Sequence, residues 1–258
     1  MKTKSFIPGT VYLTGAGIGS PDLITIRAWQ AIRAADVILY DALLPSELLE
    51  EARPYTELIY SGKLAGRHSM SQEEINRRLI HHARSGKVVI RLKGGDPMIF
   101  GRGGEEALAL LEAGVPVEII PGVSSLQVCA ASAGIPLTHR GIATGFRVLS
   151  GDPGSLSRLN AGDLSRSEET LVFFMARDRF RVIIAALLDA GMEGSMPVAW
   201  VSDAGGPSQT VQIAELKSAE NLNPDPDQPG LLLVGRTVSL HFQLPVPGEV
   251  SHAVSHFL

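Results

Sequence analysis

The sequence predicts a protein with two α/β domains, whose sheets are mostly parallel or mixed and whose active-site cleft lies between the domains. In the first half, short β-branched runs alternate with amphipathic helical stretches, which is the pattern of a mostly parallel sheet with helices on both faces. The same alternation restarts after Pro136–Arg140, and 258 residues suffice for two cores. We therefore expect domains at residues 1–140 and 141–245, followed by a tail at residues 246–258.

The first domain is expected to repeat strand, turn and helix. Ser71 and Glu74 form a capping box that starts one of the helices, and Gly86 suits its C-terminal end. The other two helices are expected at about Ile26–Ala35 and Gly103–Glu112. The expected strands are Thr10–Thr14, Asp36–Tyr40, Val88–Leu92 and Val117–Ile120.

The second domain contains one clear amphipathic helix, Phe180–Ala190, which Gly191 closes. The polar, proline-rich segment Ala219–Pro229 is expected to be a loop. The expected strands are Phe146–Leu149, Leu171–Met175, Val198–Val201, Thr210–Ile213 and Leu231–Val234.

Composition excludes several classes of function. A formal net charge of −4 argues against a nucleic-acid surface, which normally carries a basic excess. No apolar run is long enough to span a bilayer, and Met1–Pro8 does not resemble a signal peptide. The single cysteine, Cys129, lies in an apolar run and is expected to be a buried, inert thiol. We expect a cytoplasmic protein that binds neither membranes nor nucleic acids.

A glycine turn follows the first expected strand, at Gly15, Gly17 and Gly19. These glycines allow a tight turn or a close approach of the backbone to a ligand. A dinucleotide-binding fingerprint would need another glycine at position 20, where this chain has serine. A nicotinamide cofactor is therefore the less favoured interpretation of this turn.

A second glycine turn, Gly94-Gly95-Asp96, follows the strand Val88–Leu92 at its carboxyl end. Open α/β sheets place their ligands at this end of the strands. The two glycines expose main-chain groups, and Asp96 offers a carboxylate to a ribose, an amine or an ammonium. The alternative is an ordinary strand-to-helix connection in which Asp96 acts as a cap.

Charged side chains follow several of the expected strands. Asp41 ends one strand, and the loop Ser61–His68 carries three potential cations. Together with Lys93, Arg102 and Arg140, these cations suit an anionic ligand. Arg102 and Glu105 are three residues apart and can also form an ordinary surface ion pair. No spacing typical of a zinc site is present.

Eight strings, taken together, resemble one family in their order and spacing, over roughly residues 10–240. They are GAGIGSPDLIT (Gly15–Thr25), YDALLP (Tyr40–Pro45), GKLAGRH (Gly62–His68), QEEIN (Gln72–Asn76), RLKGGDPMIFGRGGEE (Arg91–Glu106), PGVSS (Pro121–Ser125), AGIPLTHR (Ala133–Arg140) and TLVFFMA (Thr170–Ala176). The family is that of the class III tetrapyrrole methyltransferases. Its members that methylate uroporphyrinogen III are the most similar.

The resemblance implies the tetrapyrrole methylase fold and a homodimer, with S-adenosyl-L-methionine bound in the interdomain cleft and S-adenosyl-L-homocysteine as a product. It implies C-methylation of uroporphyrinogen III at C2 and then C7, which gives precorrin-2 by way of precorrin-1. The partner would be this small anionic tetrapyrrole. The product would feed the biosynthesis of sirohaem, cobalamin or haem d1.

Motif matching also implies roles for individual residues. The implied catalytic residues are Asp41, Lys63, Arg102 and Glu105. The implied cofactor-binding residues are Gly17, Ile18, Gly94, Gly95, Asp96, Ile99, Ser124, Ser125, Met175 and Ala204. The implied substrate-binding residues are Arg67, His68 and Arg140, and no metal ligand is implied.

The chain departs from the family pattern at a few positions. Ile18 and Ser20 replace the usual proline and aspartate, and Ala204 stands where glycine is common. Two alternatives therefore stay open beside the implied function. One is a sister methyltransferase acting on another corrin-ring intermediate, and the other is a catalytically weak relative that binds tetrapyrrole or S-adenosylhomocysteine.

Overall fold

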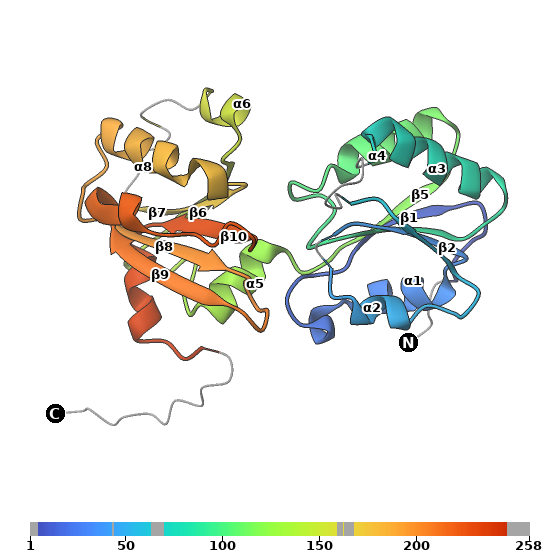
Figure 1. Cartoon of the computed structure of the whole chain (residues 1–258), viewed down its shortest axis with the longest axis horizontal. Coiled ribbons are helices and arrows are strands. Elements are labelled where there is room, and N and C mark those ends of the chain that lie inside the picture. The colour runs from blue at the N-terminus through green and yellow to red at the C-terminus, as the bar shows by residue number, and fades with distance from the viewer. Residues whose placement is uncertain (1–4, 43, 63–69, 159–161, 163–167, 247–258) are drawn as a thin grey trace. The chain divides into compact units, whose positions relative to one another are not determined.

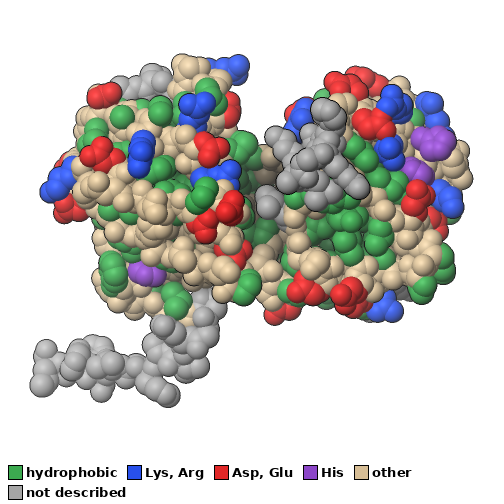
Figure 2. Space-filling model, viewed as in Figure 1, with side chains coloured by type: hydrophobic (Ala, Val, Ile, Leu, Met, Phe, Trp, Pro, Cys, Tyr) green, Lys and Arg blue, Asp and Glu red, His purple; other side chains and the backbone are tan. Residues whose placement is uncertain are grey.

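A computed structural model describes residues 5–42, 44–62, 70–158, 162 and 168–246 of the chain. They form two compact units that divide between Ser125 and Leu126, and each unit has its own sheet (Figure 1). Basic and acidic side chains are interspersed over the face shown in Figure 2. The α/β class is confirmed, with one parallel and one mixed sheet. The domain boundary near residue 140 stays a prediction.

The first unit is built on a five-stranded sheet of order β3-β2-β4-β1-β5, in which every pair of neighbours is parallel. Because all strands run the same way, all their carboxyl ends lie at one edge of the sheet. The strands are β1 (Val11–Gly15), β2 (Val37–Tyr40), β3 (Glu57–Tyr60), β4 (Val89–Lys93) and β5 (Val117–Ile120).

Helices cover both faces of this sheet (Figure 1). α1 (Ile26–Ala34) and the short α2 (Glu47–Glu50) pack on one face, where Ile90 and Leu92 of β4 point. α3 (Gln72–Arg84) and α4 (Gly103–Glu112) pack on the other, where Val89 points. Since side chains alternate along a strand, Arg91 and Lys93 also point to the face covered by α3 and α4.

Local capping explains where the helices begin and end. Ser71 accepts a hydrogen bond from the Glu74 amide at 3.2 Å, as its capping box predicts, and α3 follows. Gly86 lies just after α3 with φ +74°, a conformation that glycine adopts at low cost. Thr25 caps α1 by accepting from the Ala28 amide at 3.2 Å. A single 3-10 turn, η1 (Pro21–Leu23), precedes it.

The second unit contains a five-stranded mixed sheet of order β6-β7-β10-β8-β9. β6 pairs with β7 in parallel, and the other neighbours are antiparallel. Its strands are β6 (Gly145–Ser150), β7 (Glu169–Phe174), β8 (Pro197–Ser202), β9 (Thr210–Glu215) and β10 (Gly230–Val234). Its helices and 3-10 turns are α5 (Ser125–Ser132), α6 (Pro153–Leu156), η2 (Arg177–Arg179), α8 (Phe180–Asp189), η3 (Leu216–Asn221) and η4 (Arg236–Phe242).

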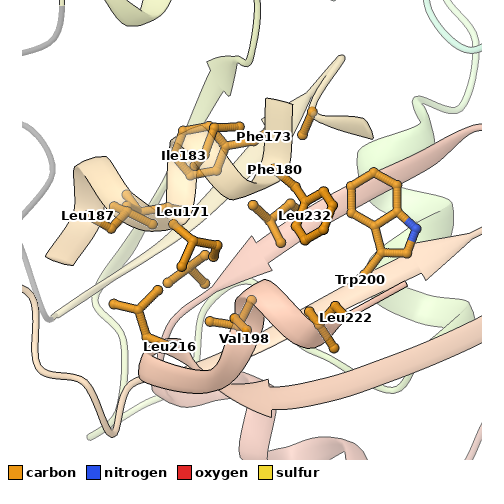
Figure 3. Close-up of a cluster of buried hydrophobic side chains, with 14 of the residues drawn as sticks. Leu171, Phe173, Phe180, Ile183, Leu187, Val198, Trp200, Leu216, Leu222 and Leu232 are labelled. Atoms are coloured by element: carbon orange, nitrogen blue, oxygen red, sulfur yellow. The ribbon is translucent and has the colours of Figure 1, made fainter. Parts of the chain in front are cut away.

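The core of the second unit lies between its sheet and α8. Figure 3 shows Phe180, Ile183 and Leu187 of α8 facing the strand residues Phe173 and Leu232. Trp200 is fully buried, and its indole N–H donates to the Ser202 hydroxyl at 2.8 Å. A buried indole thus keeps its one donor satisfied. Among the described residues, no helix is both long and apolar enough to cross a bilayer.

The predicted strands and long helices are confirmed to within one or two residues at their ends. The prediction did not include β3 (Glu57–Tyr60) or α5 (Ser125–Ser132). β3 is an edge strand with exposed side chains, so its apolar pattern is weak. The segment Ala219–Pro229 is not wholly a loop, because η3 extends into it to Asn221 and buries Ala219. Of the expected tail, residues 247–258 lie outside the described residues.

Candidate functional site

The loops after four parallel strands of the first unit meet at the carboxyl edge of its sheet. Gly15 ends β1, Asp41 follows β2, Gly94 follows β4 and Gly122 follows β5. Ligands of open α/β proteins bind at this edge. The structure therefore brings the two glycine turns and one of the implied catalytic residues to the same end of the sheet.

The glycines of these loops pack main chain against main chain. Gly17 and Gly95 exchange hydrogen bonds, with N···O distances of 3.2 and 2.8 Å. A Cβ atom on Gly15 would lie 2.5 Å from the Gly95 carbonyl oxygen, and one on Gly122 would lie 2.2 Å from it. Only glycine fits at these two positions, because the opposing atoms are backbone. Ile18 and Gly94, the chain neighbours of the hydrogen-bonded pair, are half-exposed.

Asp96 joins two of these loops through its carboxylate. Its Oδ1 accepts from the Met98 amide at 2.8 Å, and its Oδ2 accepts from the Gly122 amide at 3.0 Å. Of the two interpretations left open by the sequence, the local turn role is thus present in the structure. A contact between Asp96 and a cofactor stays a prediction.

Three more of the implied cofactor residues lie beside this base. Ser124 is buried, and a Cβ on Gly95 would lie 3.6 Å from the Ser125 amide nitrogen. Ile99 is exposed and stands between two other exposed apolar side chains, Met98 and Phe100. The edge therefore combines small hydroxyl side chains, main-chain groups and an accessible apolar run.

Four ionisable side chains form what we call the charged network: Asp41, Arg91, Lys93 and Glu106. Arg91 donates from Nη2 to Asp41 Oδ1 at 2.6 Å and from Nε to Glu106 Oε1 at 3.1 Å. Its Nη1 donates to the Ser61 hydroxyl at 3.0 Å. Lys93 Nζ lies 3.1 Å from Glu106 Oε1 and 3.7 Å from Asp41 Oδ2. Asp41 is thus held by both cations.

The members of the network differ in exposure. The side chains of Arg91 and Lys93 are 2% and 6% exposed, and that of Glu106 is fully buried, whereas that of Asp41 is 31% exposed. Burial lowers the pKa of the Lys93 ammonium from its usual value, and Arg91 lowers it further, while Glu106 and Asp41 raise it. Asp41 is the member through which the network meets solvent.

The sequence interpretation selected Asp41 but neither Arg91 nor Glu106, and it treated Lys93 as a cation for a ligand. The structure instead buries Lys93 against two carboxylates. A signal was available, because Arg91 lies in a strand predicted to be covered on both faces, and Lys93, two residues further on, would point to the same face if the strand continued. Cations at such positions need buried carboxylate partners.

Arg102 and Glu105 form an exposed pair at the start of α4. Arg102 donates from Nε and Nη2 to the Glu105 carboxylate, the shortest distance being 2.6 Å. This hydrogen bonding lowers the pKa of the Glu105 carboxyl. The two glycines that follow Arg102 differ in the space around them. A Cβ on Gly103 would lie 2.4 Å from the Pro97 carbonyl oxygen, whereas one on Gly104 would meet nothing within 4 Å.

Three of the implied site residues, Lys63, Arg67 and His68, lie outside the described residues. Arg140 belongs to the second unit, where it is exposed in a turn between the bridged residues His139 and Ala143.

The remaining two implied residues, Met175 and Ala204, lie at one edge of the second sheet. Met175 follows β7 and Ala204 follows β8, and these strands run in the same direction on either side of β10. These two strands lie two strand spacings apart, about 10 Å. Met175 is exposed and has φ +53°, a rare conformation for a residue other than glycine. Such an outlier often marks a functional position.

Among the residues that the structure describes, no group of three or more His, Cys, Asp or Glu side chains is placed to hold a metal ion. Cys129 is buried, which raises the pKa of its thiol to about 12, so this thiol is unsuited to act as a nucleophile.

Comparison with known proteins adds a family match. Residues 10–220 match the family described as Tetrapyrrole (Corrin/Porphyrin) Methylases. Siroheme synthase 1 of Halorhodospira halophila is 43% identical over 239 residues, which are 92% of this chain and 49% of that protein. Siroheme synthase of Escherichia coli is 40% identical over 236 residues, 92% of this chain and 52% of that protein. The chain thus spans about half the length of these relatives.

Solved structures agree with this match. The uroporphyrin-III C-methyl transferase of Thermus thermophilus, complexed with S-adenyl homocysteine, has a TM-score of 0.78 and 40% identity. That match covers 90% of this chain and 99% of the other. Cobalt precorrin-4 methyltransferase has a TM-score of 0.76 at 26% identity, over 89% of this chain and 96% of the other.

Proposed function

This chain belongs to the tetrapyrrole (corrin/porphyrin) methylase family, and on that premise we propose that it is a uroporphyrinogen-III C-methyltransferase. It would transfer methyl groups from S-adenosyl-L-methionine to C2 and then C7 of uroporphyrinogen III, giving precorrin-2 by way of precorrin-1. The observation that carries this proposal is the 40% identity, over nearly the full length of both chains, to the Thermus thermophilus enzyme.

The residues at the carboxyl edge of the first sheet suit a sulfonium nucleoside. Gly17 and Gly95 hold the two glycine turns together through their main-chain hydrogen bonds, and the neighbouring Ile18 and Gly94 are half-exposed. The exposed Ile99 offers an apolar surface to the adenine ring. When bound, S-adenosyl-L-methionine supplies an electrophilic methyl group. The residues that would hold it are Gly17, Ile18, Gly94, Gly95, Asp96, Ile99, Ser124, Ser125, Met175 and Ala204.

The reaction asks little covalent chemistry of the protein. A reduced pyrrole is electron-rich, so its β-carbon is itself the nucleophile, and the protein contributes mainly by holding this carbon in line with the methyl group. The methylated ring must then lose a proton. Asp41 can accept that proton, because its carboxylate stands at the site edge, is partly exposed and is held by Arg91.

The substrate carries many carboxylates and needs cations around it. Arg102 is exposed beside the site, and its guanidinium can bind a carboxylate in bidentate fashion. We also assign substrate contacts to Arg67, His68 and Arg140, and acid–base roles to Lys63 and to the Arg102–Glu105 pair. Each of these assignments rests on the family motifs.

We further propose a cytoplasmic homodimer that binds neither membranes nor nucleic acids. The negative net charge of −4 and the interspersed surface charges support the latter part (Figure 2). Light scattering on the purified chain tests the dimer, and a monomer at all concentrations would contradict it. Precorrin-2 would supply sirohaem, cobalamin or haem d1 synthesis.

The function is tested by incubating the purified chain anaerobically with uroporphyrinogen III and S-adenosyl-L-methionine carrying a labelled methyl group. We expect two labels per macrocycle and the absorbance of precorrin-2. Labelling of a later corrin intermediate alone would assign the chain to a sister methyltransferase of the family. Binding of S-adenosylhomocysteine without any turnover would indicate a binding protein.

Thermal unfolding separates the cofactor class from a nicotinamide enzyme. A ligand that binds only the native state raises the midpoint temperature in a concentration-dependent way. We expect this rise with S-adenosylhomocysteine and none with NAD, because position 20 is serine rather than the glycine of the dinucleotide fingerprint. A rise with NAD alone would overturn the cofactor assignment.

A further inference from the structure

The charged network of Asp41, Arg91, Lys93 and Glu106 contains a carboxylate that the proposed reaction does not use. Glu106 is fully buried on α4, and its Oε1 accepts from three donors: Arg91 Nε and Lys93 Nζ, each at 3.1 Å, and Gln72 Nε2 at 3.2 Å. Its Oε2 has no hydrogen-bond partner among the described residues. One oxygen of this buried carboxylate thus accepts three hydrogen bonds and the other accepts none. Leaving a buried acceptor without a hydrogen bond costs stability.

The network is neutral only as a whole, because it carries two positive and two negative charges. A buried ion pair rarely stabilises a protein more than well-packed apolar side chains of the same volume. A gain in stability therefore does not explain why four charged side chains lie together here. We attribute them to function. Three members are buried, and the fourth, Asp41, reaches the edge where the proposed site lies.

We propose that Glu106, Lys93 and Arg91 are positioning residues that fix the Asp41 carboxylate for proton removal, and that turnover needs a protonated Lys93. The inference rests on the proposed function, in which Asp41 accepts the proton. In that step, a C–H bond of the methylated ring breaks, its electron pair returns to the ring, and an O–H bond forms at Asp41. Arg91, Lys93 and Glu106 hold this acceptor and transfer no proton themselves.

The geometry explains why each member is needed. Arg91 binds Oδ1 of Asp41 and Lys93 faces Oδ2, so the carboxylate is held at both oxygens. Glu106 accepts hydrogen bonds from both of these cations at a single oxygen, Oε1. Without Glu106, two like charges would face each other in the interior with only Asp41 between them.

This arrangement makes activity depend on pH. The charged groups facing Lys93 are Arg91 on its own strand, Asp41 after β2, and Glu106 and Glu105 on α4. Burial and Arg91 lower the pKa of Lys93, whereas Glu106 raises it. As pH rises through that lowered pKa, Lys93 becomes neutral and its hold on Asp41 weakens. Activity should therefore fall on the alkaline side.

The first test compares pH–rate profiles of three variants with the wild type. In Glu106→Gln the alkaline fall should move to lower pH, since the removed carboxylate favours the charged lysine, and kcat should drop by about tenfold to 10²-fold. In Lys93→Arg the alkaline fall attributed to Lys93 should disappear, because a guanidinium stays protonated. Glu112→Gln, an exposed change on the same helix, should behave as wild type.

The second test does not depend on activity. Nitrogen NMR of labelled lysine side chains follows the titration of Lys93, whose signal is identified by its absence from Lys93→Arg. The titration should shift to lower pH in Glu106→Gln and stay unchanged in Glu112→Gln. An unshifted titration, or a shifted titration with an unchanged pH–rate profile, would overturn the proposal while methylation stands.

A variant that fails to fold can be distinguished from one that folds but does not turn over. If Glu106→Gln does not fold, the double variant Lys93→Met/Glu106→Gln removes one charge of each sign and should fold, bind S-adenosylhomocysteine and lose turnover. Full turnover of this double variant would overturn the positioning role. If the wild type methylates no tetrapyrrole, the proposed function fails and the role falls with it, and the lysine titration still reports the ion network.

Discussion

Asp96 shows how one side chain can serve both a loop and a ligand site. Each of its oxygens accepts a hydrogen bond from a main-chain amide, one from Met98 and the other from Gly122. These two hydrogen bonds connect the loop after β4 to the loop after β5. Hydrogen bonds to a charged acceptor are stronger than neutral ones. The position of the glycine turn therefore depends on this carboxylate, whatever else it contacts.

We predict that Asp96→Asn weakens both the fold and cofactor binding. The amide group can accept at only one of the two oxygen positions, so the free energy of unfolding should fall by about 1.5–3 kcal/mol. Affinity for S-adenosylhomocysteine, measured by calorimetry, should fall as well. Asp189→Asn, an exposed change in α8, is the matched control. Unchanged affinity in Asp96→Asn would count against the placement of the cofactor.

Arg102, unlike Asp96, forms its hydrogen bonds at the surface, because both Arg102 and its partner Glu105 are exposed. Their side chains are 55% and 59% exposed, so the pair adds little to stability.

We predict that Arg102→Ala reduces kcat/KM strongly, changes the free energy of unfolding by less than about 1 kcal/mol, and leaves S-adenosylhomocysteine affinity nearly intact. Steady-state kinetics and calorimetry measure the two effects separately. Arg78→Ala, which breaks the pair with Glu74 on α3, should change neither. Equal losses of turnover and of cofactor affinity in Arg102→Ala would contradict a role in substrate binding.

At the scale of elements, the ends of β1, β4 and β5 are held together by glycine backbone. Gly15 and Gly122 have their Cα atoms so near the Gly95 carbonyl that a side chain at either position would collide with main chain. A flexible side chain could move aside, but backbone in a central sheet cannot, so the three strands must separate to admit a methyl group.

A pair of glycine-to-alanine variants tests this close packing. Gly122→Ala should lower the free energy of unfolding by about 3 kcal/mol or more, since its Cβ would lie 2.2 Å from a carbonyl oxygen. Gly104→Ala meets nothing within 4 Å and should be neutral or stabilising by up to about 1 kcal/mol. Urea unfolding measures both, and similar effects of the two changes would contradict the packing described.

The whole molecule has separate cores in its two units, and each unit contains one of the two tryptophans. Trp29 is in α1, where its indole donates to Glu51 at 3.0 Å, and Trp200 is buried in the core of the second unit. Separate cores can unfold as separate cooperative steps.

We predict that Trp29→Phe makes fluorescence a report on the second unit alone. Its midpoint in urea should then differ from the midpoint seen by far-UV circular dichroism, which follows both units. Coincident transitions would show that the units unfold as one and would argue against two domains. The wild-type fluorescence, which reports both units, is the reference.

The sequence predicted those site residues whose position follows from a recognisable strand or turn nearby in the chain. Asp41, Gly95 and Asp96 each follow a strand recognisable from its apolar residues, so their common edge could be expected. Glu106 could not be placed in this way, because a glutamate near the start of a helix normally faces solvent. Only its packing against β4 shows that it is a buried partner of Arg91 and Lys93.

The sequence by itself determined the α/β class, the family, most of the elements and the glycine turns, since capping, periodicity and turn chemistry act over a few residues. The tertiary structure alone decided which strands are neighbours, such as β1 between β4 and β5, and which charges are buried together. These choices depend on contacts between residues far apart in the chain. Burial makes such contacts strong, because a charge removed from water must find its partner wherever the fold has placed it.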